Sequence, residues 1–138
     1  MELFPGPPRL LLDGAHNPAG VAALLLSLEK VERRRLILVT GIMADKDREG
    51  VLVPLLTLAD EVLTVTIDLP QATPAEELAV YCRTRGTPAV AAGDVSGGIA
   101  LGQERAGSDD LILVTGSLYL VGEARSLLLH RPGRLFQG

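Results

Sequence analysis

Residues 9–28 read RLLLDGAHNPAGVAALLLSL, a short apolar run, a polar turn and a longer apolar run. The first run, from Arg9 to Leu12, is apolar at successive positions, which is typical of a strand covered on both faces. The longer run repeats at the i, i+3, i+4 and i+7 spacing of one helix face, through Val21, Leu24, Leu25 and Leu28. The segment therefore predicts a buried strand that leads directly into a helix.

Strand and helix patterns alternate along the rest of the chain. Further strands are expected at Leu36 to Val39, Val62 to Ile67, Ala89 to Ala92 and Leu111 to Val114. Further helices are expected at Val51 to Leu58, from Pro74 to near Gly86, after Asp94, and through Leu120 to Leu128 until Arg131-Pro132-Gly133-Arg134. Apolar strands joined by helix-length connections predict a doubly wound α/β fold, with a mostly parallel sheet and helices on both faces.

Two local features refine this organisation. Thr73-Pro74-Ala75-Glu76 matches a capping box, in which Thr73 caps the helix and Pro74 takes its first position. The proline-rich residues 1–8 are interpreted as the residual end of an interdomain connector, and residues 9–138 as one domain.

Composition and charge exclude several classes of protein. A hydrophobic content of 47% and a mean hydropathy of +0.30 exclude a disordered tail. With 13 Lys and Arg against 17 Asp and Glu, the net charge of −4 disfavours nucleic-acid binding. The one cysteine, Cys82, can form neither an internal disulfide nor a thiolate metal site, which favours a reducing compartment. The chain lacks a signal-peptide pattern and an apolar run of about 20 residues, so we expect a cytoplasmic protein without a membrane partner.

Function is expected at the turns after the strands, because doubly wound sheets bind ligands beyond the carboxyl ends of their strands. The sequence has no G-x-x-x-x-G-K-[ST] loop and no G-x-G-x-x-G after a strand, so the usual nucleotide-binding loops are absent. It has no G-x-S-x-G elbow for a hydrolase triad, and His130 is interpreted as a basic residue that ends the last helix. No catalytic residue is assigned to this chain alone.

The first turn holds Asp13, His16 and Asn17. The carboxylate of Asp13 and the imidazole of His16 could together meet a ribose, a phosphate or an amino-acid ligand. An ordinary structural interpretation is also open, in which Asp13 makes the turn and Asn17 caps a helix that begins at Pro18.

The second and third turns also carry polar side chains. Lys46 and Asp47 follow the second strand, where flanking carboxylates could hold the Lys46 ammonium or the loop could simply be solvated. Gly116 and Ser117 follow the last strand, and a helix N-terminus there would suit an anionic group. Ser117 could instead only cap the helix, and Tyr119 could only pack. Three polar turns at one edge of a sheet favour a site more than any one of them.

These three turns also carry a resemblance to a known family. The sequence resembles the C-terminal, Rossmann-like domain of folylpolyglutamate synthase/dihydrofolate synthase, in the Mur ligase superfamily. Residues 12–18, LDGAHNP, match one segment of that family; residues 41–47, GIMADKD, resemble its G-x-x-x-D-K-D turn; residues 114–119, VTGSLY, match its last turn. The three segments occur in the family's order and spacing across almost the whole chain.

The resemblance implies an ATP-dependent ligase that adds L-glutamate to folate or dihydropteroate through an acyl phosphate. It implies that ATP and Mg²⁺ are bound mainly by a larger N-terminal ATPase domain, whose motifs are absent here and which would be the partner of this domain. The family's Trp-Pro-Gly-Arg stretch should have just ended where Met1 begins. No metal ligand is assigned to this chain, and the isolated chain is expected to be inactive.

By the same resemblance, Asp13, His16 and Asn17 would lie at the ATP and glutamate site when the two domains close. Ser117 would help to hold the glutamate. Lys46, Asp47 and Tyr119 match family positions, but no specific contact is assigned to them.

Two other interpretations stay open. One is a stand-alone flavodoxin-like or receiver-like binding module. A receiver needs an acidic cluster after its first strand and an aspartate after its third; Asp68 meets the second condition, but Asp13 stands alone and Pro70 follows closely. The other is an interaction module whose exposed face docks another protein.

Overall fold

The computed structural model of the protein describes residues 1–130 and contains one six-stranded sheet. The strands are β1 (Glu2–Phe4), β2 (Arg9–Asp13), β3 (Leu36–Thr40), β4 (Glu61–Thr64), β5 (Ala89–Ala91) and β6 (Leu111–Thr115). They lie in the order β1-β2-β6-β3-β4-β5, and all pairs are parallel except β1 with β2. The predicted mostly parallel α/β sheet is confirmed.

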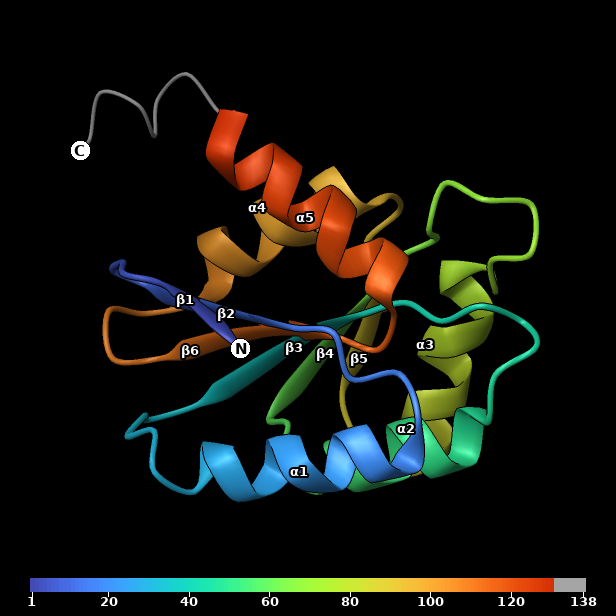
Figure 1. Ribbon diagram of the computed structural model, residues 1–138, viewed down its shortest axis with the longest axis horizontal. Coiled ribbons are helices and arrows are strands. Elements are labelled where there is room, and N and C mark those ends of the chain that lie inside the picture. The colour runs from blue at the N-terminus through green and yellow to red at the C-terminus, as the bar shows by residue number, and fades with distance from the viewer. Residues whose placement is uncertain (131–138) are drawn as a thin grey trace.

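Five helices cover the two faces of this sheet (Figure 1). They are α1 (Pro18–Leu28), α2 (Arg48–Leu56), α3 (Ala75–Thr84), α4 (Val95–Arg105) and α5 (Leu118–His130). One core packs α1, α2 and α3 against one face, and a second core packs α4 and α5 against the other. Within β3, Leu36 and Leu38 point into the first core and Ile37 and Val39 into the second, which explains why the strand is apolar throughout. No helix in residues 1–130 is both long and apolar enough to span a bilayer.

The register brings the ends of three strands to one level. Thr115 at the end of β6 lies opposite Asp13 of β2 on one side and Thr40 of β3 on the other. From this level α1 leaves β2 toward one face of the sheet, whereas α5 leaves β6 toward the other. Neighbouring strands whose helices leave on opposite faces form the switch point at which such sheets bind ligands.

Most predicted elements are confirmed, but several ends differ. The strand predicted to reach Ile67 ends at Thr64, because its neighbours β3 and β5 end opposite Thr64, at Thr40 and Ala91. The strand β1 falls in the segment interpreted as a connector and was not expected, since three residues before a proline carry no readable period. The prediction that residues 131–134 end the last helix lies outside the described residues.

The predicted capping box is wrong. Pro74 is the N-cap residue of α3, which begins at Ala75 without a capping side chain, while Thr73 is buried. The amide of Ala75 instead donates to Thr66 Oγ1 at 2.8 Å. A threonine from the preceding loop therefore satisfies the helix end that Thr73 was expected to satisfy.

The helix α4 contains several glycines, which are poor helix formers, yet one of them allows it to pack closely against the sheet. A Cβ on Gly98 would lie 2.3 Å from Val65 Cγ1, closer than packed side chains allow. Gly98 thus lets α4 lie directly on the sheet, and this packing outweighs the cost of glycine in the helix.

Candidate functional site

The three polar turns meet at the carboxyl ends of β2, β6 and β3. The amide of Gly116 donates to the carbonyl oxygen of Ala15 at 3.0 Å, which joins the turn after β6 to the turn after β2. A Cβ on Gly50 would lie 2.7 Å from Pro18 Cγ, so the starts of α2 and α1 are in contact as well. In Figure 1 the strands β2, β6 and β3 run toward the right-hand side, where α1, α2 and α5 begin. The prediction that these turns share one edge is confirmed.

The turn after β2 is held by its own side chains. Asp13 Oδ1 accepts a hydrogen bond from Ala15 N at 2.9 Å, and Asp13 Oδ2 lies 3.5 Å from the amino nitrogen of Met1. His16 Nδ1 lies 2.9 Å from the carbonyl oxygen of Gly14. Because a carbonyl only accepts, Nδ1 carries the proton, and Nε2 of a neutral His16 is left as an acceptor with no partner among residues 1–130.

Asn17 does what the structural interpretation predicted. Its Oδ1 accepts from Gly20 N at 2.8 Å and caps α1, which begins at Pro18. The side-chain amide of Asn17 remains exposed at the same edge, so capping the helix and contacting a ligand are compatible roles.

Ser117 is also a helix cap. Its Oγ accepts from Tyr119 N at 3.1 Å and Leu120 N at 3.4 Å, and the residue is 4% exposed. A hydroxyl that accepts these bonds still has its proton to donate. Tyr119 does not pack into the core, because it is 61% exposed, and Leu118 beside it is 60% exposed. The candidate site therefore has an apolar, partly aromatic rim.

The turn after β3 differs from expectation at Lys46. Asp47 caps α2, with Oδ1 accepting from Gly50 N at 2.9 Å. Lys46 is exposed, and no ion pair joins it to another residue of the described chain, so the flanking carboxylates do not hold its ammonium. This turn places the amino end of α2 at the site, but it does not fix Lys46.

Helix ends contribute positive charge to the electrostatics of this edge. Three helices, α1, α2 and α5, begin here, and each directs the positive end of its dipole and its first amides toward the edge. Such ends attract phosphate and carboxylate groups. Within residues 1–130, no three His, Cys, Asp or Glu side chains are grouped so that they could hold a metal ion. The exposed helix ends at this edge thus suit an anionic group.

Sequence reasoning left two groups of residues near this edge out of the candidate site. Thr40 and Thr115 are fully buried at the ends of β3 and β6, and a threonine at a strand end gave no signal on its own. A cleft of about 720 Å³ lies farther along the edge, lined by Asp68, Asp94 and Glu123 among others. Burial raises the pKa of Glu123, and the charges of Asp68 and Asp94 raise it further.

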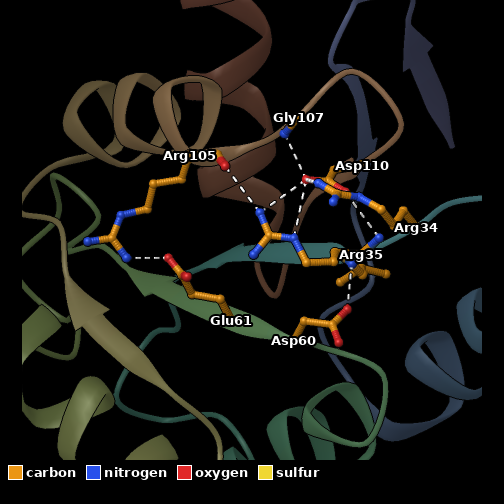
Figure 2. Close-up of polar contacts among 8 residues, drawn as sticks. Arg34, Arg35, Asp60, Glu61, Arg105, Gly107 and Asp110 are labelled. Carbon is orange, nitrogen blue, oxygen red and sulfur yellow. Dashed lines mark hydrogen bonds and ion pairs between the residues drawn. The ribbon is translucent and has the colours of Figure 1, made fainter.

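The opposite edge of the sheet holds a structural ion cluster (Figure 2). Buried Asp110 accepts from Gly107 N at 2.7 Å and Arg35 N at 3.2 Å, and it pairs with the guanidinium groups of Arg34 and Arg35. Nearby, Arg105 pairs with Glu61. These contacts join the loops that enter β3 and β6, so they support the fold far from the candidate site.

Comparisons with known proteins agree with this geometry. The family described as Mur ligase, glutamate ligase domain, matches residues 1–118. The probable bifunctional folylpolyglutamate synthase/dihydropteroate synthase of Haloferax volcanii is 36% identical over 126 residues, covering 91% of this chain and 15% of that protein. The dihydrofolate synthase/folylpolyglutamate synthase of Bacillus subtilis is 29% identical, covering 93% of this chain and 30% of that protein. The chain therefore spans less than a third of the length of either relative.

Solved structures show the same similarity. Mycobacterium tuberculosis folylpolyglutamate synthase complexed with ADP and AMPPCP matches with a TM-score of 0.83 and 29% identity, over 95% of this chain and 32% of that one. E. coli FolC in complex with DHPP and ADP matches with a TM-score of 0.86 over 94% of this chain and 31% of that one. At 24% identity, the second match supports the fold alone.

Proposed function

Because the chain belongs to the Mur ligase family as a glutamate ligase domain, we propose that it is the C-terminal domain of an ATP-dependent ligase that adds L-glutamate to folate or dihydropteroate. The observation that carries this proposal is the hydrogen-bonded union of the turns after β2 and β6, which bear the DGAHNP and TGSLY segments, at the switch point of the sheet. The chain spans less than a third of its relatives, so the complete reaction also needs the remainder of a longer protein.

The groups that this chain presents at the candidate site indicate which parts of the substrates it would contact. The amino ends of α1 and α5 suit the anionic phosphates of ATP and the carboxylates of glutamate. His16 Nε2 and the Ser117 hydroxyl supply one acceptor and one donor beside them, and Asp13 fixes the turn between them. In this reaction ATP transfers its γ-phosphoryl group to the acceptor carboxylate and leaves as ADP, and the amine of glutamate then attacks the acyl phosphate, which forms the amide and releases inorganic phosphate. Groups that hold the reactants in place and stabilise developing charge supply the catalysis.

The rest of the active site is assigned to the N-terminal ATPase domain. That domain would bind most of ATP and hold Mg²⁺, which neutralises the phosphate charge, and it would hold the folate. Asp13, His16, Asn17 and Ser117 are the proposed ATP and glutamate contacts of this chain, and exposed Tyr119 stands at their rim. Lys46 and Asp47 have no assigned contact. A cytoplasmic location is part of the same proposal.

The receiver-like alternative is not favoured. The family match covers residues 1–118, and Asp13 is the only carboxylate of the turn after β2. The proposal is supported instead by motif residues that the fold brings to one place.

Amide NMR of the 138-residue chain, titrated with ADP and then with L-glutamate, tests the assignment of the site. We expect shifts at the amides of residues 13–17 and 115–120, which His16→Ala reduces. His130→Ala is the matched control, since His130 is the chain's other histidine and is exposed at the end of α5. Shifts centred on Asp68, Asp94 and Glu123 would contradict the assignment.

A further inference from the structure

Two buried threonines link the turns of the candidate site. Thr40 and Thr115 are both fully buried at the ends of neighbouring strands. Thr40 Oγ1 donates to the carbonyl oxygen of Thr115 at 2.7 Å, and Thr115 Oγ1 donates to that of Ala15 at 3.4 Å. The hydroxyls therefore form a series that crosses from β3 to β6 and from β6 to the turn after β2.

The link is completed by Gly116. Its amide donates to the same carbonyl of Ala15, so that oxygen receives two bonds from the end of β6. Gly116 has a φ of +123°, and a Cβ there would lie 2.6 Å from Thr40 Oγ1. Glycine is therefore required both by its backbone conformation and by the threonine hydroxyl beside it.

Ala15 is fixed at both of its backbone polar groups. Its amide donates to Asp13 Oδ1 at 2.9 Å, and its carbonyl is held by Thr115 and Gly116. His16 follows Ala15 directly, and Ser117 follows Gly116 directly. The series of hydroxyl bonds thus joins the His16 turn to the Ser117 turn, beside the backbone bond from Gly116 to Ala15.

The core alone does not require these hydroxyls. Valine has nearly the shape of threonine, favours strands, and avoids the cost of burying a polar group. β3 and β6 share the sequence LILVTG, residues 36–41 and 111–116, and are paired in register, so each ends on a threonine and a glycine where the turns meet. In β3 and β6 the only polar side chain is the threonine at the end nearest the candidate site.

We propose that Thr40 and Thr115 are positioning residues that hold His16 and Ser117 at a fixed separation in the ligase site. The inference rests on the proposed function for the identity of the ligand. The claim that the threonines fix the separation of the two turns rests on the hydrogen bonds alone. Neither threonine touches the ligand. Each acts through the backbone of Ala15 and Gly116.

The chain offers a matched control for the test. Thr64 is also fully buried at a strand end, and its Oγ1 donates to the carbonyl oxygen of Ala75 at 2.7 Å, away from the turns that carry His16 and Ser117. Thr64→Val removes a buried bond of the same kind and length as Thr40→Val. Thr40→Ser keeps a hydroxyl at position 40, so it should also keep the positioning function that Thr40→Val loses.

The experiment compares the three variants in the 138-residue chain by amide NMR, hydrogen exchange and ADP titration, well below their unfolding temperatures. We expect Thr40→Val to shift the amides of Ala15, His16, Gly116 and Ser117, to speed exchange at Gly116, and to weaken ADP binding about tenfold. Thr40→Ser should behave as the parent chain does. Thr64→Val should leave all three readouts as they are in the parent chain.

The inference is overturned if Thr40→Val leaves these amides and the ADP affinity unchanged, or if Thr64→Val changes them as much. Should Thr40→Val fail to fold, Thr115→Val enters the same comparison under the same criteria. If the parent chain itself shows no ADP binding, the proposed ATP contacts of this chain are contradicted, whereas the assignment of most of the ATP site to the N-terminal domain is not. The amide shifts and the exchange at Gly116 then decide the positioning role without it.

Discussion

Asp110→Asn should remove one pH-dependent part of the folding free energy. The substitution keeps the size of a buried side chain but removes its charge. Burial disfavours the charged form of Asp110, but hydrogen bonds from Gly107, Arg34 and Arg35 outweigh burial and lower its pKa from 3.8 to about 2. Because the pKa is lower in the folded state, the carboxylate stabilises the fold above about pH 4, and this stabilisation is lost as the pH falls toward 2.

The size of the effect follows from the pKa and from solvent screening. A difference of almost two pKa units corresponds to about 2 kcal/mol at most. The side chains of Arg34 and Arg35 are 63% and 38% exposed, so screening should reduce the pH-dependent part to about 1 kcal/mol. Asparagine also offers one acceptor oxygen where the carboxylate offers two. The total loss near pH 7 should therefore reach about 2 kcal/mol.

Urea unfolding followed by circular dichroism measures this prediction for both proteins near pH 7 and at about pH 2.5. The stability difference between the parent chain and Asp110→Asn should shrink by about 1 kcal/mol at the lower pH. Asp109→Asn is the matched control, since Asp109 is the adjacent, exposed carboxylate. A difference that does not change with pH, or an equal effect of Asp109→Asn, would refute the reasoning.

Three further outcomes follow from the packing. Gly98→Ala should destabilise the fold by about 1–3 kcal/mol, because its Cβ would overlap Val65, whereas Gly122→Ala, which meets open space, should stabilise α5 by about 0.5–1 kcal/mol; urea unfolding checks the opposite signs. The Cys82 thiol, whose pKa burial raises to about 11, should resist a soluble disulfide reagent near pH 8 until guanidinium unfolds the chain; full reaction of the folded chain would contradict this. Ser117→Ala should cost about 1 kcal/mol in thermal unfolding by removing the cap of α5, and an unchanged midpoint would show that the cap is not needed.

The sequence carries the fold in its strands and helix faces. The apolar segments of β2, β3, β4 and β6 were readable because these strands are buried on both faces. The stripe through Val21, Leu24 and Leu28 was readable because α1 is buried on one face. The capping box failed because Thr66, eight residues before Pro74, accepts the hydrogen bond from the amide of Ala75. That competition depends on how the loop after β4 folds back, which local pattern does not contain.

The candidate site was predictable in position but not in its internal bonds. The motifs placed Asp13, His16 and Ser117 at one edge, and strand order then made their turns neighbours. The hydroxyl bonds of Thr40 and Thr115 were not predictable, since they depend on the register of β6 between β2 and β3. A one-residue slip of β6 would point the Thr115 hydroxyl to the other face of the sheet and move the Thr115 carbonyl away from Thr40.

Ligase activity tests the central claim most directly. This chain is joined to an N-terminal ATPase domain of the same family and supplied with ATP, Mg²⁺, L-glutamate and a folate. The account predicts ADP release that requires glutamate, folate and both domains, that falls at least about tenfold in His16→Ala, and that is unchanged in His130→Ala. Ligase activity of the 138-residue chain alone, or a folded, ATP-binding two-domain protein that is equally active with and without His16→Ala, would contradict it.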